Sequence, residues 1–253
     1  MNYLLKITYD GKNYHGWQIQ ENALTVQEVF QKALNKILNA EYEIKGCSRT
    51  DSGVHANEYY VNVKTERKIP PHRLKAALNG NLPSDVAVLD SQTVSEDFHA
   101  RYNCIGKQYI YKIWNSEVKN PFLDGYALHY RWHIDEDLLN KAAKYFEGKH
   151  DFTSFCTLDR RKQENMTRTV YSAGVTRNGD MIIFKIEADG FLYNMVRIMT
   201  GTLLRVAQGK FAPDDIPGII SAKSRKKAGP TAPACGLYLN KVSYKKEDLC
   251  EPE

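Results

Sequence analysis

Alternating apolar and polar residues predict a series of β-strands along this chain, and apolar residues spaced three and four apart predict helices between them. The expected strands lie near residues 2–9, 41–47, 57–65, 85–94, 107–114, 168–177, 181–187 and 237–244. The expected helices lie near residues 26–38, 71–78, 135–146, 192–207 and 213–222. Thr25 and Glu28 form a capping-box pattern before the first helix, and Asn178-Gly179 predicts a tight hairpin loop. Because hairpins interrupt the alternation of strands and helices, the pattern indicates an α+β fold with a mainly antiparallel mixed sheet.

The predicted elements fall into two halves of similar order, residues 1–115 and 116–253. A length of 253 residues fits one large domain or two of ordinary size. The repeated order suggests a tandem duplication with a cleft between the halves.

Composition narrows the class of protein without deciding its function. The longest apolar runs, such as Met181-Ile-Ile-Phe184, are too short to cross a bilayer, and the N-terminal residues lack a signal-peptide layout. Five cysteines without a Cys-x-x-Cys pair indicate reduced thiols, and dispersed histidines argue against structural zinc. We therefore expect a soluble intracellular protein. A net charge of +5 is compatible with nucleic-acid binding but equally with many ordinary enzymes.

The segment Gly46-Cys-Ser-Arg-Thr-Asp-Ser-Gly-Val-His-Ala56 places an arginine, a threonine and an aspartate side by side between two predicted strands. Loops between strands are where a rigid scaffold usually presents reactive groups. The same residues would also suit a turn in which Asp51 bonds nearby backbone N–H groups and Arg49 stays solvated. Spacing alone leaves the active site and the turn evenly matched.

Two further stretches are strongly basic. Residues 158–168 contain Arg160 and Arg161, and residues 222–230 contain Lys226. Clustered cations gain free energy on binding nucleic acid by releasing condensed counterions. A solvated polar loop explains each stretch equally well.

Motifs spread over nearly the whole chain resemble those of the tRNA pseudouridine synthase A family. Beside the segment at 46–56, the resemblance rests on Tyr9-Asp-Gly-Lys-Asn-Tyr-His-Gly-Trp-Gln18, Asn79-Gly-Asn-Leu-Pro83, Asp97-Phe-His-Ala-Arg101, His150-Asp-Phe-Thr-Ser-Phe155, Met195-Val-Arg197 and Gly236-Leu-Tyr-Leu239. One departure is Ser48, where many members carry glycine. The resemblance implies the pseudouridine synthase fold, with helices on one face of the sheet and a central RNA-binding cleft.

The resemblance also implies an isomerase that exchanges the C–N glycosidic bond of uridine for a C–C bond. Asp51 would be the catalytic nucleophile, kept ionised by pairing with Arg197, although an arginine on so apolar a helix could instead reach the surface. Arg49 would occupy the space that the extruded base leaves in the RNA stem. Tyr109 would stack on the uracil and Leu237 would line the pocket, although core packing explains both residues without the resemblance.

The family further implies tRNA as substrate, uridines 38, 39 and 40 of the anticodon stem-loop as targets, no cofactor or metal, a homodimer and a cytoplasmic location. A glycosidase would need a second, protonated carboxyl group, which the motif does not supply. Two alternatives stay open: an RNA-binding protein without catalysis, in which Asp51 is structural, and a paralogue that modifies other uridines.

Overall fold

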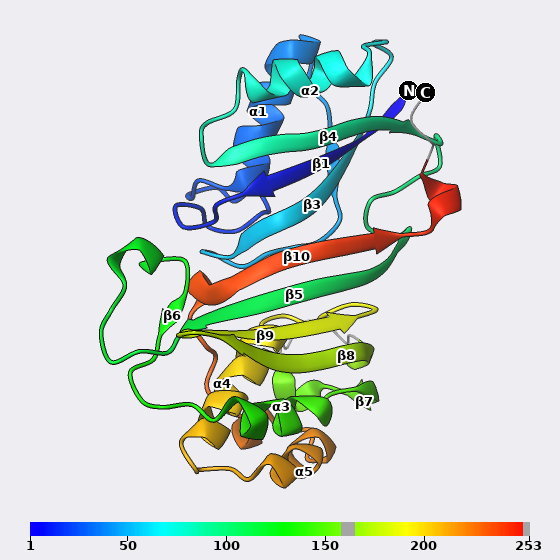
Figure 1. Cartoon of the computed structure of the whole chain (residues 1–253). Coiled ribbons are helices and arrows are strands. Elements are labelled where there is room, and N and C mark those ends of the chain that lie inside the picture. The colour runs from blue at the N-terminus through cyan, green and yellow to red at the C-terminus, as the bar shows by residue number, and fades with distance from the viewer. Residues whose placement is uncertain (158–164, 250–253) are drawn as a thin grey trace. The chain divides into compact units, whose positions relative to one another are not determined.

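The computed structural model describes residues 1–157 and 165–249. The chain forms two compact units (Figure 1), which are described separately. Unit 1 comprises Met1–Gly106 and Tyr238–Glu253, and unit 2 comprises Lys107–Leu237. The expected halves were 1–115 and 116–253. The difference arises because the division falls inside one strand, after Gly106, and because the final strand belongs to unit 1.

Unit 1 contains a sheet in the order β4-β1-β3-β10, and the short strand β2 also pairs with β3. Its strands are β1 (Asn2–Tyr9), β2 (Ile44–Gly46), β3 (His55–Lys64), β4 (Val86–Val94) and β10 (Leu237–Tyr244). β1 is antiparallel to both β3 and β4, whereas β10 runs parallel to β3. In β1, all eight residues are buried or half-buried, as expected for a central strand.

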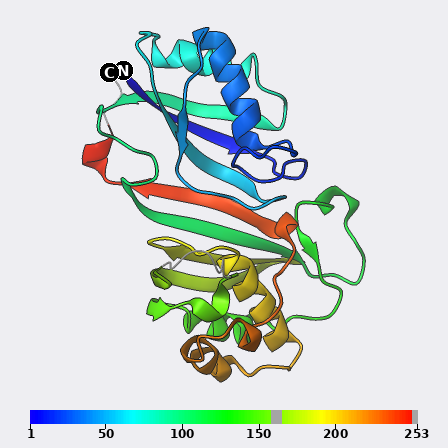
Figure 2. The same cartoon turned by 180° about the vertical axis from the view of Figure 1, so that it is seen from behind.

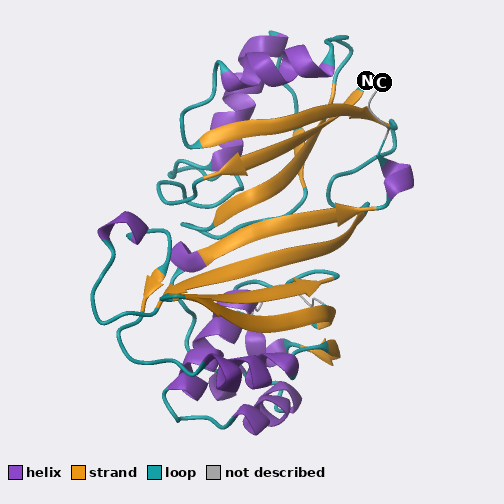
Figure 3. Cartoon of the chain, in the orientation of Figure 1, coloured by secondary structure: helices purple, strands orange, loops and turns teal. Residues whose placement is uncertain are grey.

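Helices α1 (Val26–Leu38) and α2 (Pro71–Asn79) contact each other, and α2 lies along β4 (Figures 1 and 3). Thr25 is the N-cap of α1, as the sequence predicts, because its hydroxyl accepts a hydrogen bond from the Glu28 N–H. Pro70-Pro71 starts α2, where a proline costs no helical hydrogen bond.

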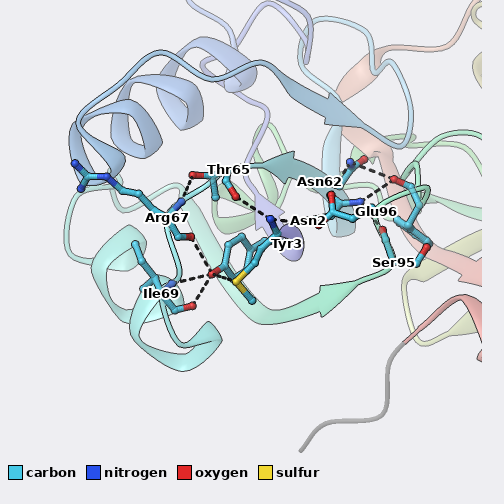
Figure 4. A network of polar contacts seen from close by, with 10 residues as sticks. Asn2, Tyr3, Asn62, Thr65, Arg67, Ile69, Ser95 and Glu96 are labelled. Atoms are coloured by element: carbon cyan, nitrogen blue, oxygen red, sulfur yellow. Dashed lines mark hydrogen bonds and ion pairs between the residues drawn. The ribbon is translucent and has the colours of Figure 1, made fainter.

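A buried polar network joins β1 and β3 to the segment that follows β4 (Figure 4). The Asn62 amide donates to Asn2 Oδ1 at 3.1 Å, and the Asn2 amide donates to the carbonyls of Ser95 and Phe98 at 2.9 and 3.0 Å. Asn2 and Asn62 are only 1% and 2% exposed. Their satisfied amides therefore fix residues 95–98 against the sheet, because a broken bond would leave a buried polar group unpaired.

Unit 2 contains strands in the order β5-β9-β8-β7, and β6 pairs with β5. Its strands are β5 (Cys104–Trp114), β6 (Leu128–His129), β7 (Gly148–Asp151), β8 (Thr167–Asn178) and β9 (Met181–Ala188). The longer strands pair antiparallel, and β8 and β9 form the expected hairpin. Helix α3 (Glu136–Lys144) contacts β8 and α4 (Met195–Ala207), and a shorter helix, α5 (Ile216–Ser221), follows.

The predicted fold class is confirmed, since each unit has a mainly antiparallel sheet with helices against one face. Figure 2 shows α1 in front of the strands of unit 1, and in unit 2 α3 contacts both β8 and α4. β6 and β7, of two and four residues, were not predicted because such short strands carry too few alternating positions. Among the described residues, no helix has the length and apolarity that a membrane span requires. The central cleft stays a prediction.

Candidate functional site

The loop at residues 46–56 (the Arg-Thr-Asp loop) connects β2 to β3 and lies directly on the segment at residues 10–17. The Trp17 N–H donates to the Thr50 carbonyl at 3.2 Å, and the Gly53 N–H donates to the Tyr14 carbonyl at 3.1 Å. Gly16 has φ +84°, and a Cβ at that position would overlap the Thr50 carbonyl oxygen. The two backbones thus approach as closely as they do only because residue 16 is glycine.

The Arg-Thr-Asp loop ends in a tight turn. The main-chain carbonyl of Asp51 accepts from the Val54 N–H at 3.1 Å, and Gly53 within the turn has φ +77°. It is therefore the backbone of Asp51 that closes this turn, which leaves the position of its carboxylate to be set independently.

The three side chains that name the loop differ in exposure. Thr50 is buried and its hydroxyl lies 2.8 Å from the Tyr9 hydroxyl, whereas Arg49 is exposed and Asp51 is half-buried. Beneath the loop, the rings of Trp17 and Tyr59 stack with centroids 4.2 Å apart, and Tyr59 also bonds Ser48. Thr50 and the aromatic rings form the base of the loop, and the exposed Arg49 and the half-buried Asp51 flank Thr50 in the chain.

His55 follows the turn as the first residue of β3 and is 2% exposed. Its Nδ1 lies 3.0 Å from Asp10 Oδ1 and 3.1 Å from the Gly11 nitrogen, and its ring stacks on Tyr238 at 4.6 Å. Nδ1 can satisfy only one of the two neighbours at a time, since it accepts from Gly11 when unprotonated and donates to Asp10 when protonated. Either way, His55 ties the far end of the loop to the segment at 10–17.

In the sequence, the segment at 10–17 stands out only as part of a motif of the family resemblance, with no role of its own. The structure shows that it carries the Arg-Thr-Asp loop. Its signal was the pair of glycines, Gly11 and Gly16, close to two buried aromatic residues, Tyr14 and Trp17. Neither glycine reveals from sequence which distant backbone it contacts.

In unit 2, Tyr109 lies on β5 opposite Ile186 of β9 and is 6% exposed. The rings of Tyr109 and Phe191 pack edge to face, with centroids 5.0 Å apart and planes at 82° to each other. Arg197 lies in the first turn of α4, where its Nε donates to the Ala232 carbonyl at 2.8 Å and its Nη1 donates to Asn194 Oδ1 at 2.8 Å. These two neutral acceptors orient the guanidinium.

The segment at residues 229–237 lies against α4 and ends at Leu237. Leu237 is the first residue of β10 and is 5% exposed. The Ala232 N–H donates to the Arg197 carbonyl at 3.0 Å, and the Tyr111 hydroxyl donates to the Pro233 carbonyl at 2.7 Å. Burial strongly raises the pKa of Tyr111 and also raises the pKa of the Cys235 thiol. Both groups are therefore neutral at physiological pH and contribute packing and hydrogen bonding rather than charge.

Comparison with known proteins identifies the family to which the chain belongs. The sequence profile described as "tRNA pseudouridine synthase" matches residues 6–103 and 142–245. The chain belongs to the tRNA pseudouridine synthase family. It is similar to proteins named tRNA pseudouridine synthase A from Thermoanaerobacter sp. (strain X514), Ruminiclostridium cellulolyticum and Clostridium acetobutylicum. These are 46%, 46% and 44% identical, over 96%, 95% and 96% of this chain and 99%, 98% and 99% of theirs.

Among solved structures, one chain in the crystal structure of the archaeal box H/ACA sRNP Nop10-Cbf5 complex is similar at 13% identity and a TM-score of 0.34. The match covers 89% of this chain and 60% of that one. We draw nothing from so remote a likeness.

The basic residues of this synthase-family chain are only partly described. Arg160 and Arg161 lie outside the described residues. Lys226 is exposed within a short 3-10 turn, Arg225–Lys227. Its neighbour Arg225 donates to the Gly229 carbonyl at 2.8 Å and to the Thr231 hydroxyl at 3.2 Å, and burial lowers its pKa. Arg225 is therefore used to hold the turn, and Lys226 is presented to solvent.

The site residues implied by the sequence thus divide between the units. Unit 1 holds Arg49 and Asp51 on one loop, and unit 2 holds Tyr109, Arg197 and Leu237. The pairing of Asp51 with Arg197 stays a prediction. Within residues 1–157 and 165–249, no group of three or more His, Cys, Asp or Glu side chains could hold a metal ion.

Proposed function

We propose that this protein isomerises uridine to pseudouridine in the anticodon stem-loop of tRNA, at positions 38, 39 and 40. The observation that carries the proposal is the Arg-Thr-Asp loop of a synthase-family chain, which presents Arg49 and Asp51 from a rigid base on a buried threonine. Full-length similarity to proteins named tRNA pseudouridine synthase A supports tRNA as the substrate.

Asp51 is proposed as the catalytic nucleophile. An ionised carboxylate such as that of Asp51 can form a covalent bond with the sugar or base and then leave again. The isomerisation breaks the bond from C1′ to N1 and forms a bond from C1′ to C5; C5 loses its proton to solvent and N1 gains one. The reaction is neutral in electrons and adds no atom to the product, so it requires no redox partner.

Arg49 is proposed to fill the place of the extruded uridine. A uridine in a stem must be unstacked before an enzyme can reach it, at a cost of a few kcal/mol. The exposure of Arg49, next to the buried Thr50, supports this role because the guanidinium is available to the RNA.

Arg197, Tyr109 and Leu237 are proposed to complete the site. Arg197 would act as the cation for Asp51, which its fixed orientation on Ala232 and Asn194 supports. Tyr109 would stack on the uracil, a contact that contributes about 1–3 kcal/mol per base. Lys226 would contact phosphate, a role that sequence alone proposes for Arg160 and Arg161.

Tritium release tests the activity directly. The purified protein is given tRNA labelled at C5 of uracil, and label released to water is counted. We expect release by the wild type and by Asp90→Asn, an exposed carboxylate on β4, and none above background by Asp51→Ala or Asp51→Asn. Release by Asp51→Ala at the wild-type rate would remove Asp51 from catalysis, and no release from any tRNA by the wild type would remove the activity.

Mapping by primer extension on tRNA from cells with and without the protein tests the positions. Pseudouridine lost at 38, 39 or 40 supports the proposal. Loss only elsewhere would identify a paralogue with other targets.

We also propose that the protein is a cytoplasmic homodimer. The similar proteins named tRNA pseudouridine synthase A support a location where tRNA is processed, and the five cysteines of the sequence include no Cys-x-x-Cys pair, which suits a reducing compartment. For the dimer the family expectation is the support, and sedimentation of a monomer at working concentration would contradict it.

A further inference from the structure

The turn at residues 98–103 (the 98–103 turn) exposes an aromatic ring in unit 1. Tyr102 is 77% exposed, and its ring lies against that of His99 with centroids 4.3 Å apart and planes 40° apart. Proteins usually bury tyrosine at least partly, so an exposed tyrosine against a half-buried histidine ring on a defined turn suggests a contact surface.

The 98–103 turn is held firmly from below. The Ala100 N–H donates to Asn62 Oδ1 at 2.9 Å, and the Ala100 carbonyl accepts from the Tyr244 hydroxyl at 2.6 Å. Asn62 is in turn bonded to Asn2 in the buried network of Figure 4. Burial raises the pKa of Tyr244 far above its ordinary value, so its hydroxyl stays protonated and available as a donor.

The turn is also closed within itself. The N–H groups of Tyr102 and Asn103 donate to the His99 carbonyl at 3.1 and 3.0 Å, and the Arg101 N–H donates to His99 Nδ1 at 3.0 Å. The Tyr102 ring therefore sits on a preorganised support, which reduces the entropy lost when a ligand stacks on it.

The charges around the pair favour an anionic partner. Burial lowers the pKa of His99, and the positive charges of Lys45 and Arg101 lower it further, while Glu43 opposes them. His99 is therefore neutral near pH 7. Glu43 pairs with Lys45, so the exposed Arg101 leaves the group with one net positive charge beside the exposed ring.

We propose that Tyr102, supported by His99 and flanked by Arg101, is a stacking platform for an unpaired base of the RNA substrate. The inference rests on the proposed function for the presence of RNA and adds a contact away from the Arg-Thr-Asp loop. An unpaired base offers a flat π-face to the ring and a phosphate to the guanidinium, whereas a base within a duplex offers no free face.

Equilibrium binding of tRNA, measured by filter retention in an Asp51→Ala background that prevents turnover, tests the platform. Tyr102→Ala should weaken binding on the order of tenfold, and Tyr102→Phe should keep most of the affinity because the ring remains. Phe122→Ala removes an aromatic ring that is 89% exposed in unit 2 and serves as the matched control. It should leave binding unchanged. Circular dichroism checks that each variant is folded.

Single-stranded oligouridylate and an RNA duplex of the same length separate base stacking from phosphate attraction. Tyr102→Ala should lose affinity for the single strand and keep its affinity for the duplex. Equal losses on both RNAs, an equal loss with Phe122→Ala, or no loss at all would overturn the platform. A Tyr102→Ala protein with unchanged RNA affinity but altered sedimentation would instead assign the surface to a second copy.

Failure of the platform and failure of the proposed function give different results. A wild type that releases tritium from tRNA while Tyr102→Ala binds as tightly as its parent refutes only the platform. A wild type that releases no tritium refutes the function, whatever the binding data show.

Discussion

The position of the Arg-Thr-Asp loop depends most directly on Gly16. Its positive φ and missing Cβ allow the Thr50 carbonyl to approach closely. We expect Gly16→Ala to destabilise the protein by about 2 kcal/mol or more, through backbone strain together with the overlap. It should also lower tritium release beyond the loss of folded protein, because Arg49 and Asp51 move with the loop. Urea unfolding and tritium release measure the two effects.

Gly179→Ala is the matched control. Gly179 also has a positive φ, +58°, but a Cβ there would meet nothing within 4 Å. It should cost about 1 kcal/mol from strain alone and leave activity per folded molecule unchanged. Equal effects of the two substitutions on activity would show that the contact with Thr50 does not position the loop.

Tyr60 on β3 gives a prediction about alkaline pH. Burial raises the pKa of Tyr60 to about 12, with the negative charge of Glu58 adding to the effect. The unfolded chain loses the Tyr60 proton near pH 10, before the folded protein does. The contribution of Tyr60 to the free energy of unfolding is therefore fully present below about pH 10 and is lost between about pH 10 and 12. Tyr60→Phe should make that fall shallower, as measured by urea unfolding at a series of pH values. An identical slope in both proteins would contradict the prediction.

At the residue scale, the sequence could single out Arg49 and Asp51 as candidates because reactive residues concentrated in one loop are visible without coordinates, and their roles stay a prediction. It could not identify His55 or Gly16 as supports of that loop. Their role depends on contacts with Asp10 and Thr50, which are distant in the chain, and a lone histidine or glycine carries no periodic signal.

At the scale of elements, α4 and the segment at residues 229–237 are packed backbone to backbone. A Cβ on Gly201 would overlap the Pro230 carbonyl oxygen, and the Gly229 N–H donates to the Thr202 hydroxyl at 2.9 Å. We expect Gly201→Ala to destabilise unit 2 by about 1–3 kcal/mol despite the better helix propensity of alanine. It should also lower activity, because the displaced segment carries the Ala232 carbonyl that orients Arg197.

Gly218→Ala in α5 separates propensity from packing, since a Cβ there meets nothing within 4 Å. We expect it to stabilise the protein by about 0.5–1 kcal/mol. If Gly201→Ala stabilised the protein as well, the close approach of the segment to α4 would be disproved. Thermal unfolding of both variants beside the wild type gives the comparison.

Periodicity predicted the long elements well because each exposes one face and buries another. α1 begins at Val26 after the predicted Thr25 cap, and β10 covers the expected residues. The hairpin loop is displaced by one position, since Asn178 still pairs with Met181 and the loop is Gly179-Asp180. A register of this kind is decided by pairing across the strands, which the local sequence does not contain.

At the scale of the whole molecule, unit 1 is assembled from two separate stretches of chain, whereas unit 2 is one continuous stretch. Removing residues 238–253 should loosen unit 1, because β3 loses its parallel partner and His55 loses the Tyr238 ring. Hydrogen exchange should then accelerate at β1 and β3 and stay unchanged at β8 and β9. Removal of residues 245–253 alone, which leaves β10 in place, should not accelerate it.

The composition of the two units also explains why the sequence alone could not predict where the division between them falls. The predicted boundary near residue 115 followed the end of a strand, and no local pattern reveals that a strand after residue 237 returns to the first unit. Such a return is a long-range pairing, and it is visible only once His55 is seen beside Tyr238.

The parallel pairing of β10 with β3 has a consequence for folding while the protein is being synthesised on the ribosome. Because β10 follows all of unit 2 in chain order, the parallel partner of β3 and the Tyr238 ring against His55 are added only after unit 2 has been synthesised. Contacts so far apart in the chain form late, since the intervening loop must be closed first. A chain that stops before residue 237 would therefore carry Asp51 on a sheet that lacks β10, so we expect full activity on RNA only once residues 237–244 have been synthesised.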